Sequence, residues 1–327
     1  MKVLITGGAG YIGSHAAHAL IKSGYKVVVV DDLSQGHKEL LPLEAEFYRC
    51  DIGNIAEIRG IFKKTQVDQI LHFAGLVSVS DSVTDPLSYY QTNFSKAANF
   101  LSVALDCGVT QFVFSSTAAV YGTPKEIPVK ETSALNPESP YGASKLMFER
   151  LLQDVAKSSK LKFVILRYFN VAGAHSSGEI GQISDNATHL IKRAVEAGCG
   201  KRNSIEVYGT DYPTKDGTGV RDYIHVEDLA EAHVLALKYL KSGGESDIFN
   251  CGYGSGYSVK EVLAMVEKVS GQNLNIVNSA RRDGDIASIV ADSSKIISKL
   301  GWRPRFTALS DICNSSFAWE KKCLSRK

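Results

Sequence analysis

The chain has 327 residues, enough to bury a large core as two compact units or as one large α/β unit. Its formal net charge is +2 and no dense run of Lys and Arg interleaved with aromatics is present, so we expect no nucleic-acid partner. No apolar run approaches the roughly 20 residues needed to cross a bilayer, and no signal-peptide pattern opens the sequence, so we expect a cytoplasmic protein without a membrane partner. The six cysteines lack the paired short spacings of a zinc site, and we expect them to be reduced, with no metal bound.

Short β-rich runs alternate with helical stretches through the first half of the chain. Five runs read as buried strands, at residues 3–6, 27–31, 70–73, 112–115 and 163–168. The connections between them are long enough for helices, as parallel neighbouring strands require. The pattern therefore predicts an α/β fold with a Rossmann-type, doubly wound parallel sheet.

The rhythm changes after about residue 168, where turn-rich segments separate shorter elements and indicate a smaller C-terminal lobe. A further strand at 222–224 and a helical run at 226–240 again resemble the first half. We therefore expect one domain at residues 1–172, with a contribution from about 221–250, and a smaller lobe at 173–327.

A glycine-rich turn directly follows the first predicted strand. Gly7, Gly10 and Gly13 stand three apart and open a helix, where backbone amides can approach a pyrophosphate at the positive end of the helix dipole; a simple tight turn is the alternative. Asp31 ends the second strand, where its carboxylate can bind ribose hydroxyls and repel a 2′-phosphate, so NAD is favoured over NADP. Asp51 is a plausible adenine contact, although a turn-capping role fits equally well.

Tyr141 and Lys145 form the main candidate for chemistry. A serine and a proline at 139–140 predict a helix start, which puts the phenol and the ammonium about one turn apart on one face. A lysine charge at about 4 Å is worth about 4 kcal/mol at an effective dielectric near 20, enough to lower the pKa of a tyrosine substantially. An ordinary amphipathic helix is the alternative. Tyr121 and Lys125 share the spacing, but a proline between them prevents a common helical face.

These motifs resemble a known family. Residues 6–13, the Ser-Ser-Thr run at 115–117 and the Tyr141 and Lys145 pair resemble the extended short-chain dehydrogenase/reductases. Segments 207–214, 216–226 and 281–285 extend the resemblance to the UDP-sugar 4-epimerases of that family, over essentially the whole chain. The resemblance implies an isomerase of carbohydrate metabolism that inverts C4 of a UDP-hexose (UDP-glucose or UDP-galactose) through a transient 4-keto sugar, using tightly bound NAD.

The same resemblance implies residue roles, an NAD-binding domain at 1–172 and a substrate-binding lobe at 173–327. The implied catalytic residues are Thr117, Tyr141 and Lys145. The implied NAD contacts are Gly7, Gly10, Tyr11, Ile12, Gly13, Asp31, Asp32, Asp51, Ile52, Phe73, Ala74, Gly75, Asn93, Tyr141, Lys145 and Tyr168. The implied UDP-sugar contacts are Thr117, Tyr141, Asn170, Tyr208, Arg221, Tyr223, Arg282, Asp285 and Ile289, the last at the position that gates sugar size.

Other functions remain open at this point. A 4-epimerase of UDP-N-acetylglucosamine or of a UDP-pentose would use the same residues. A nucleotide-sugar 4,6-dehydratase needs further acid and base groups, whereas Thr117 is followed by Ala118 and Ala119. A non-enzymatic NAD sensor would not need Tyr141 and Lys145. The resemblance also implies a homodimer through helices at 86–107 and 140–157, although each helix could equally cover its own sheet.

Overall fold

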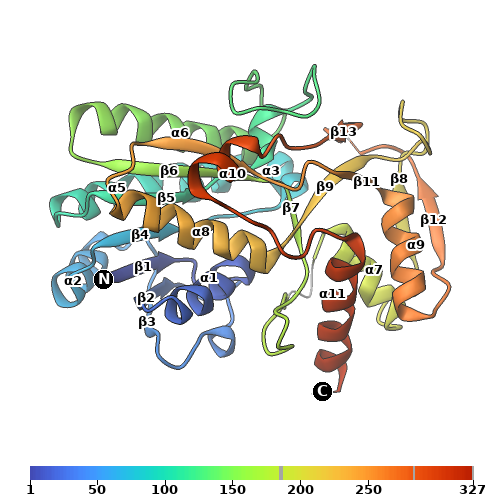
Figure 1. Ribbon diagram of the computed structural model, residues 1–327, viewed down its shortest axis with the longest axis horizontal. Coiled ribbons are helices and arrows are strands. Elements are labelled where there is room, and N and C mark those ends of the chain that lie inside the picture. Colours follow the sequence, from blue (N-terminus) through green and yellow to red (C-terminus); the bar gives the residue numbers. More distant parts are fainter. Residues whose placement is uncertain (184–186, 283, 326–327) are drawn as a thin grey trace.

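The structure is a computed structural model that describes residues 1–183, 187–282 and 284–325 (Figure 1). Within those residues a seven-stranded parallel sheet has the order β10-β6-β5-β4-β1-β2-β3. Its strands are β1 (Lys2–Thr6), β2 (Lys26–Asp31), β3 (Glu46–Arg49), β4 (Gln69–His72), β5 (Gln111–Ser115), β6 (Lys162–Tyr168) and β10 (Asp247–Cys251). The strand order reverses between β1 and β4, and open α/β sheets bind ligands beyond the strand ends at such a switch point.

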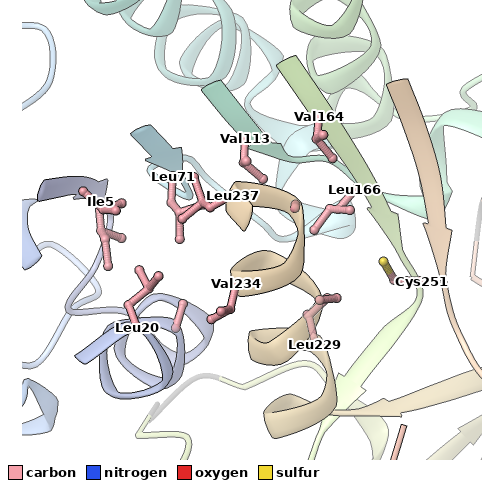
Figure 2. Close-up of a cluster of buried hydrophobic side chains, with 14 of the residues drawn as sticks. Ile5, Leu20, Leu71, Val113, Val164, Leu166, Leu229, Val234, Leu237 and Cys251 are labelled. Carbon is pink, nitrogen blue, oxygen red and sulfur yellow. The ribbon is translucent and has the colours of Figure 1, made fainter. Parts of the chain in front are cut away.

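Helices cover both faces of this sheet, as the predicted doubly wound fold requires. One face packs against α1 (Tyr11–Lys22), α8 (Val226–Lys241) and α10 (Ser294–Leu300), and the other against α2 (Ile55–Thr65), α5 (Ala97–Asp106) and α6 (Pro140–Ser158). Figure 2 shows the first face, where Leu20 of α1 and Val234 and Leu237 of α8 gather with Leu71 and Val113 of the sheet. Alternate residues of each strand enter opposite cores, because successive side chains point to opposite faces of a sheet. The helix α8 and the strand β10 both come from the second half of the chain.

The remaining elements form smaller sheets and a separate helical group beyond the strand ends (Figure 1). The strand β9 (Val220–His225) pairs with β7 (Asn170–Ala172), β11 (Gly256–Ser258) and β13 (Ser288–Ile289), and β8 (Ile205–Tyr208) pairs with β12 (Ile276–Ser279). Around them lie α7 (Leu190–Gly198), α9 (Val259–Ser270) and α11 (Leu309–Leu324), which share one apolar core. None of the described helices is both long and apolar enough to cross a membrane.

The stretch from residue 86 to 107 differs from one regular helix. It consists of α4 (Pro86–Tyr90), a π-helical turn at Gln91–Lys96 and α5, and it is preceded by the short helix α3 (Val79–Thr84). A π turn inserts an extra residue and rotates the side chains that follow it, and such turns are frequent at functional sites. Here the turn carries Asn93.

Candidate active site

The glycine turn lies between β1 and α1, at the switch point of the sheet. Gly7 has a φ of +66°, and a Cβ there would lie 2.6 Å from the Ala74 nitrogen; a Cβ at Gly13 would lie 2.3 Å from the Gly7 oxygen. Contacts inside the protein therefore require glycine at both positions, and this agrees with the interpretation of the segment as a tight turn. A Cβ at Gly10 would meet the Gly7 oxygen at 3.3 Å and nothing else within 4 Å in the described residues. Gly10 is thus the glycine that leaves the N-terminus of α1 open to a ligand.

The first turn of α1 offers backbone donors at this opening. Gly10 is the N-cap residue, and no side chain of the described residues caps the helix. Uncapped amides at a helix N-terminus are a ready anion site, so the turn fits a pyrophosphate. Ile12 packs against the core beneath, while the Tyr11 hydroxyl donates to the Gly173 carbonyl at 2.6 Å. Tyr11 therefore ties the turn to the segment that follows β7.

Asp31 lies at the carboxyl end of β2, where the sequence predicts it. Its Oδ2 accepts from the Ala9 nitrogen at 2.9 Å and its Oδ1 accepts from the Leu33 nitrogen at 2.9 Å. Burial raises the pKa of the Asp31 carboxyl above its ordinary value, against the effect of these two amides. Asp32 is more exposed and accepts from the Ser34 nitrogen at 2.8 Å. The carboxylate of Asp31 therefore fixes the glycine turn and keeps acceptor capacity for ribose hydroxyls.

Asp51 follows β3 and already has partners in the protein. It accepts from the Gly53 nitrogen at 2.8 Å and forms an ion pair with Lys96. The turn-capping role that the sequence left open is thus present in the structure. Ile52 is buried in the core beside α2. A ligand contact by Asp51 would have to be made in addition to these bonds.

The segment after β4 forms the next wall of the site. The nitrogens of Phe73 and Ala74 donate to the Thr6 carbonyl at 3.0 and 3.1 Å, which holds the segment beside the glycine turn. Asn93, in the π-helical turn, accepts from the Leu76 nitrogen at 2.8 Å and donates to the Leu76 carbonyl at 3.0 Å. The extra residue of the π turn thereby aims a buried amide at this segment.

Gly75 lies where this wall meets the candidate catalytic residues. A Cβ at Gly75 would lie 2.8 Å from Oδ1 of Asn93 and 3.6 Å from Nζ of Lys145. Asn93 also donates to the Ser144 hydroxyl at 3.2 Å, one residue before Lys145. A glycine at 75 therefore allows the wall, the π turn and α6 to meet.

Tyr141 stands in the first turn of α6, as predicted. Pro140 is the first helical residue, and the Ser139 side chain accepts from the Gly142 nitrogen at 3.2 Å. Thr117, after β5, lies beside Tyr141 and acts to lower the pKa of its phenol, and both residues are buried. A hydroxyl pair of this kind can bind a substrate hydroxyl and move a proton at its oxygen.

Lys145 lies one turn further along α6, and in the ligand-free chain its ammonium binds the end of β5. Its Nζ donates to the Ser115 carbonyl at 3.0 Å and lies 4.9 Å from the centroid of the Phe114 ring. Burial lowers the pKa of Lys145 from 10.5 to about 8, although Glu149 opposes this. A buried ammonium must find an acceptor, and the nearest one is the strand carbonyl.

The pKa of Tyr141 accordingly moves in the opposite direction from the expectation. Burial raises it from 10.0 to about 12, Thr117 acts against that rise, and Tyr89 adds to it. The expectation of a lowered Tyr141 pKa is therefore wrong for the ligand-free chain. Tyr168, at the end of β6, adjoins the same phenol, and burial together with Tyr141 raises its pKa strongly. The sequence missed Tyr89, whose ring meets Tyr141 edge-on with centroids 6.4 Å apart.

Five of the predicted UDP-sugar residues lie on the smaller sheets, at positions 170, 208, 221, 223 and 289, and Arg282 and Asp285 lie in the loop before β13. Arg282 pairs with Asp285 through two bonds of 2.8 and 3.2 Å and lies 4.5 Å above the Tyr208 ring. Arg221, on β9, is largely buried, and burial lowers the pKa of its guanidinium, while Tyr223 and Asp285 oppose that effect. Asp283, inside the recognised motif, lies outside the described residues. Two arginines facing one region provide a site for a diphosphate.

Strand pairing connects this region with the catalytic residues. Asn170 on β7 pairs with Tyr223 on β9, and Ile289 on β13 pairs with Arg221. Ile289 is 4% exposed and packs with Ala118, the residue after Thr117. The sugar-gating position therefore lies against the segment that carries the candidate catalytic threonine.

Tyr212 is a further residue of this region that the sequence left without a role. It is buried, its hydroxyl has no hydrogen-bond partner within the described residues, and Arg281 lies 4.2 Å above its ring. Tyr212 lies in the segment 207–214 that carries part of the family resemblance, but the spacing of the residues does not single out its hydroxyl. In the part of the chain that the structure describes, no group of three His, Cys, Asp or Glu side chains could hold a metal ion.

A glycine turn that fits a pyrophosphate, an aspartate that fits a ribose and a buried Tyr141–Thr117 pair define a dinucleotide-dependent enzyme of the Rossmann type. Residues 3–252 match the family model described as the NAD dependent epimerase/dehydratase family. The chain belongs to this family.

Similar proteins extend the match to the whole chain. The UDP-glucose 4-epimerase of Azospirillum brasilense is 47% identical over 320 residues, which cover 98% of this chain and 92% of that protein. The solved UDP-glucose-4-epimerase of Stenotrophomonas maltophila, with bound NAD and formylated UDP-arabinopyranose, has a TM-score of 0.95 and 40% identity, covering 100% of this chain and 99% of that chain. The UDP-Glc/GlcNAc 4-epimerase of Campylobacter jejuni has a TM-score of 0.86 and 44% identity, covering 98% and 99%. The resemblance that the sequence motifs indicated is confirmed.

Proposed function

We propose that the protein is an NAD-dependent enzyme that interconverts UDP-glucose and UDP-galactose by inverting C4 of the hexose. The observation that carries this proposal is the buried Tyr141–Thr117 pair, placed between the glycine turn and the arginine region. The C–H bond at an alcohol carbon is not acidic, so inversion requires oxidation to a ketone and reduction from the other face. Bound NAD supplies reversible acceptance of a hydride. The net redox change is zero.

The NAD site would use the walls already described. Beside the open Gly10, the amides of Tyr11 and Ile12 would bind the pyrophosphate, and Asp31 with Asp32 would bind the adenosine ribose. The further members of this proposed set, which shape the site around the adenine and the nicotinamide, are Gly7, Gly13, Asp51, Ile52, Phe73, Ala74, Gly75, Asn93, Lys145 and Tyr168. The Asp31 carboxylate offers acceptors, which suit ribose hydroxyls and disfavour a phosphate.

Tyr141 would take the proton from the sugar O4 during oxidation and return it during reduction. Thr117 would hydrogen-bond the same oxygen and hold it beside the phenol. Lys145 remains charged below about pH 8, because its pKa is about 8. Its positive charge at this end of the sheet would stabilise the negative charge that develops on the phenol.

The UDP moiety would bind on the smaller sheets. Arg221 and Arg282 would clamp the diphosphate, and Asp285 would accept from the uridine ribose. Arg282 and Asp285 are paired in the ligand-free chain, so they are already aligned with each other. The remaining proposed contacts are Asn170, Tyr208 and Tyr223.

The finer assignments concern breadth, assembly and location. Ile289 is smaller than a tyrosine, so we propose measurable activity on the N-acetyl pair in addition to the hexoses. For a homodimer, Val83, Leu87 and Met147 are exposed on α3, α4 and α6, which pack against one another. Exposed apolar side chains on adjoining helices suit a contact between two copies. We also propose the cytoplasmic location that the sequence indicated.

The decisive experiment incubates purified protein with UDP-galactose, with UDP-N-acetylgalactosamine and with UDP-xylose in parallel, without added NAD. We expect UDP-glucose to form from UDP-galactose while no NADH accumulates. A 4-keto-6-deoxy product would indicate dehydration instead, and binding of NAD without turnover would indicate a sensor. Conversion of UDP-xylose alone would assign a pentose epimerase.

A further inference from the structure

Glu149 lies one turn beyond Lys145 on α6 and contacts the same strand end. Lys145 donates to the carbonyl of Ser115, and the carboxylate of Glu149 accepts from the hydroxyl of Ser116. Successive turns of the helix thus bind the last residue of β5 and the residue after it. Residues four apart on a helix share a face, so the carboxylate and the ammonium are neighbours.

This double attachment fixes the residue that follows. Thr117 comes directly after Ser116, and it lies beside Tyr141 of the first turn of the same helix. Tyr141, Lys145 and Glu149 therefore hold α6 against the end of β5 over three turns. Releasing the Glu149 attachment would loosen the strand end beside the proposed catalytic pair.

Glu149 is held in place by a buried arginine. Arg167 donates through Nε to both carboxylate oxygens, at 3.1 and 3.2 Å, and through Nη2 at 2.6 Å. Their side chains are 0% and 1% exposed. A buried ion pair gives little net stability relative to apolar residues, whereas breaking it by removing one partner typically costs about 3–5 kcal/mol. The pair therefore needs an explanation other than stability.

The bonds of Arg167 continue across the molecule towards the sugar-gating position. Its Nη1 donates to the Tyr121 hydroxyl at 3.1 Å, and that hydroxyl donates to Asn250 at 2.6 Å. Asn250 in turn donates to the Val129 carbonyl at 3.0 Å, and the Val129 nitrogen donates to the Val290 carbonyl at 2.8 Å. This network joins α6 to Val290, the residue that follows Ile289 at the end of β13.

The charged and titratable groups around Lys145 single out Glu149. On β4, burial and Lys145 lower the pKa of His72 to about 3, so that imidazole is neutral. On α6 and β6, Tyr141 and Tyr168 have raised pKa values and are neutral, and Arg167 is paired with Glu149. Among the described residues, Glu149 is the group whose charge favours the Lys145 ammonium.

We propose that Glu149 is a positioning residue of this site: its carboxylate keeps the neighbouring ammonium charged and anchors the strand end that carries Thr117. This inference rests on the proposed function, in which Thr117, Tyr141 and Lys145 carry out proton transfer. The partner Arg167 orients the carboxylate through its three hydrogen bonds. The role of the Glu149–Arg167 ion pair is therefore to hold a negative charge beside the Lys145 ammonium.

The test is a titration of Lys145 that needs no substrate. Protein labelled with 13C at the lysine Cε positions is titrated by NMR, and the Lys145 signal is assigned by its absence in Lys145→Met. Glu149→Gln keeps the shape of the side chain and removes the charge, so we expect the midpoint to fall by about one unit or more. Glu149→Asp keeps the charge on a shorter side chain, and we expect its midpoint to stay closer to that of the wild type.

Unchanged midpoints in Glu149→Gln, or equal shifts in the Gln and Asp variants, would overturn the proposal. If Glu149→Gln does not fold, the double variant E149Q/R167M removes both buried charges and is expected to fold. Because the repelling Arg167 charge is lost as well, its midpoint should fall by less than in Glu149→Gln but stay below that of the wild type. A wild-type midpoint in the double variant would equally overturn it. Where the enzyme turns over, the alkaline limb of the kcat profile should move with the midpoint, whereas a merely structural role would lower Tm and leave that limb in place. Lack of epimerase activity in the wild type would refute the proposed function and leave the titration decisive for Glu149.

Discussion

Replacing Tyr141 by Phe removes one oxygen from the centre of the site. Burial raises the pKa of this phenol to about 12, so at pH 7 the neutral form is favoured by about 7 kcal/mol in the ligand-free chain. Proton transfer by a positioned group contributes about 10²–10⁴-fold, or about 3–6 kcal/mol of barrier. The folded state loses at most the interaction of this hydroxyl with Thr117, worth about 1 kcal/mol. We therefore expect kcat to fall at least about a hundredfold while the fold and bound NAD persist.

The assay follows formation of UDP-glucose from UDP-galactose by chromatography, with circular dichroism and acid-extracted NAD as checks on folding and cofactor. Tyr121→Phe is the matched control, because it also removes one buried phenolic oxygen. That hydroxyl bonds Asn250 and Arg167, so its loss should cost about 1–3 kcal/mol of stability but leave kcat within about tenfold. A Tyr141→Phe protein with a native spectrum and kcat within tenfold of wild type would refute the assigned role.

Three further outcomes are expected. Protein purified without added cofactor should release NAD on acid extraction, and NADP as the main dinucleotide would contradict this. The Asp31→Ala variant should release much less NAD, because the Ala9 and Leu33 amides lose their acceptor. Turnover should decline above about pH 8, where Lys145 loses its charge. The pKa of Lys145 is about 8 in the folded chain and 10.5 in the unfolded chain, so the charged group destabilises the fold most below pH 8 and no longer does so near pH 10.5. The unfolding free energy of the wild type relative to Lys145→Met should therefore rise by up to about 3 kcal/mol between pH 8 and pH 10.5. A fall over that range would contradict the assignment. Ile289→Tyr should lower kcat/KM for the N-acetyl pair more than for the hexose pair. The larger side chain should also lower the stability of the protein by about 1–3 kcal/mol through overpacking, whichever substrate is used. Equal losses of kcat/KM on the two pairs would show that this side chain does not select the sugar.

The features that the sequence predicted correctly depend on local signals. The strand at residues 27–31 is a continuous β-branched run, and the structure has β2 at Lys26–Asp31. The start of α6 follows from a capping serine and an N1 proline, both seen in the structure. Tyr121 and Lys125 do not share a helix, because a short 3₁₀ segment ends at Tyr121. Chain-local chemistry of this kind needs no knowledge of distant contacts.

The features that the sequence did not predict depend on distant contacts. The spacing of Tyr141 and Lys145 indicates a common face, but the direction of the ammonium depends on Ser115, thirty residues away along the chain. The π turn that aims Asn93 at the segment after β4 has no local signature comparable to a cap or a proline. Arg167 and Glu149 are both buried, yet one lies on a strand and the other on a helix, so spacing could not pair them.

Burial acts on the two ionisable groups of the site in opposite directions. It raises the pKa of Tyr141 from 10.0 to about 12 and lowers that of Lys145 from 10.5 to about 8. At neutral pH the ligand-free chain therefore holds a neutral phenol and a charged ammonium. An epimerisation both removes and returns the O4 proton, so the phenol must be a competent acid as well as a base. A pKa well above neutrality suits the return step, and the removal step then relies on positive charge near the phenol. The carboxylate of Glu149 favours the charged form of Lys145, and it thereby supports the step for which the phenol alone is poorly suited.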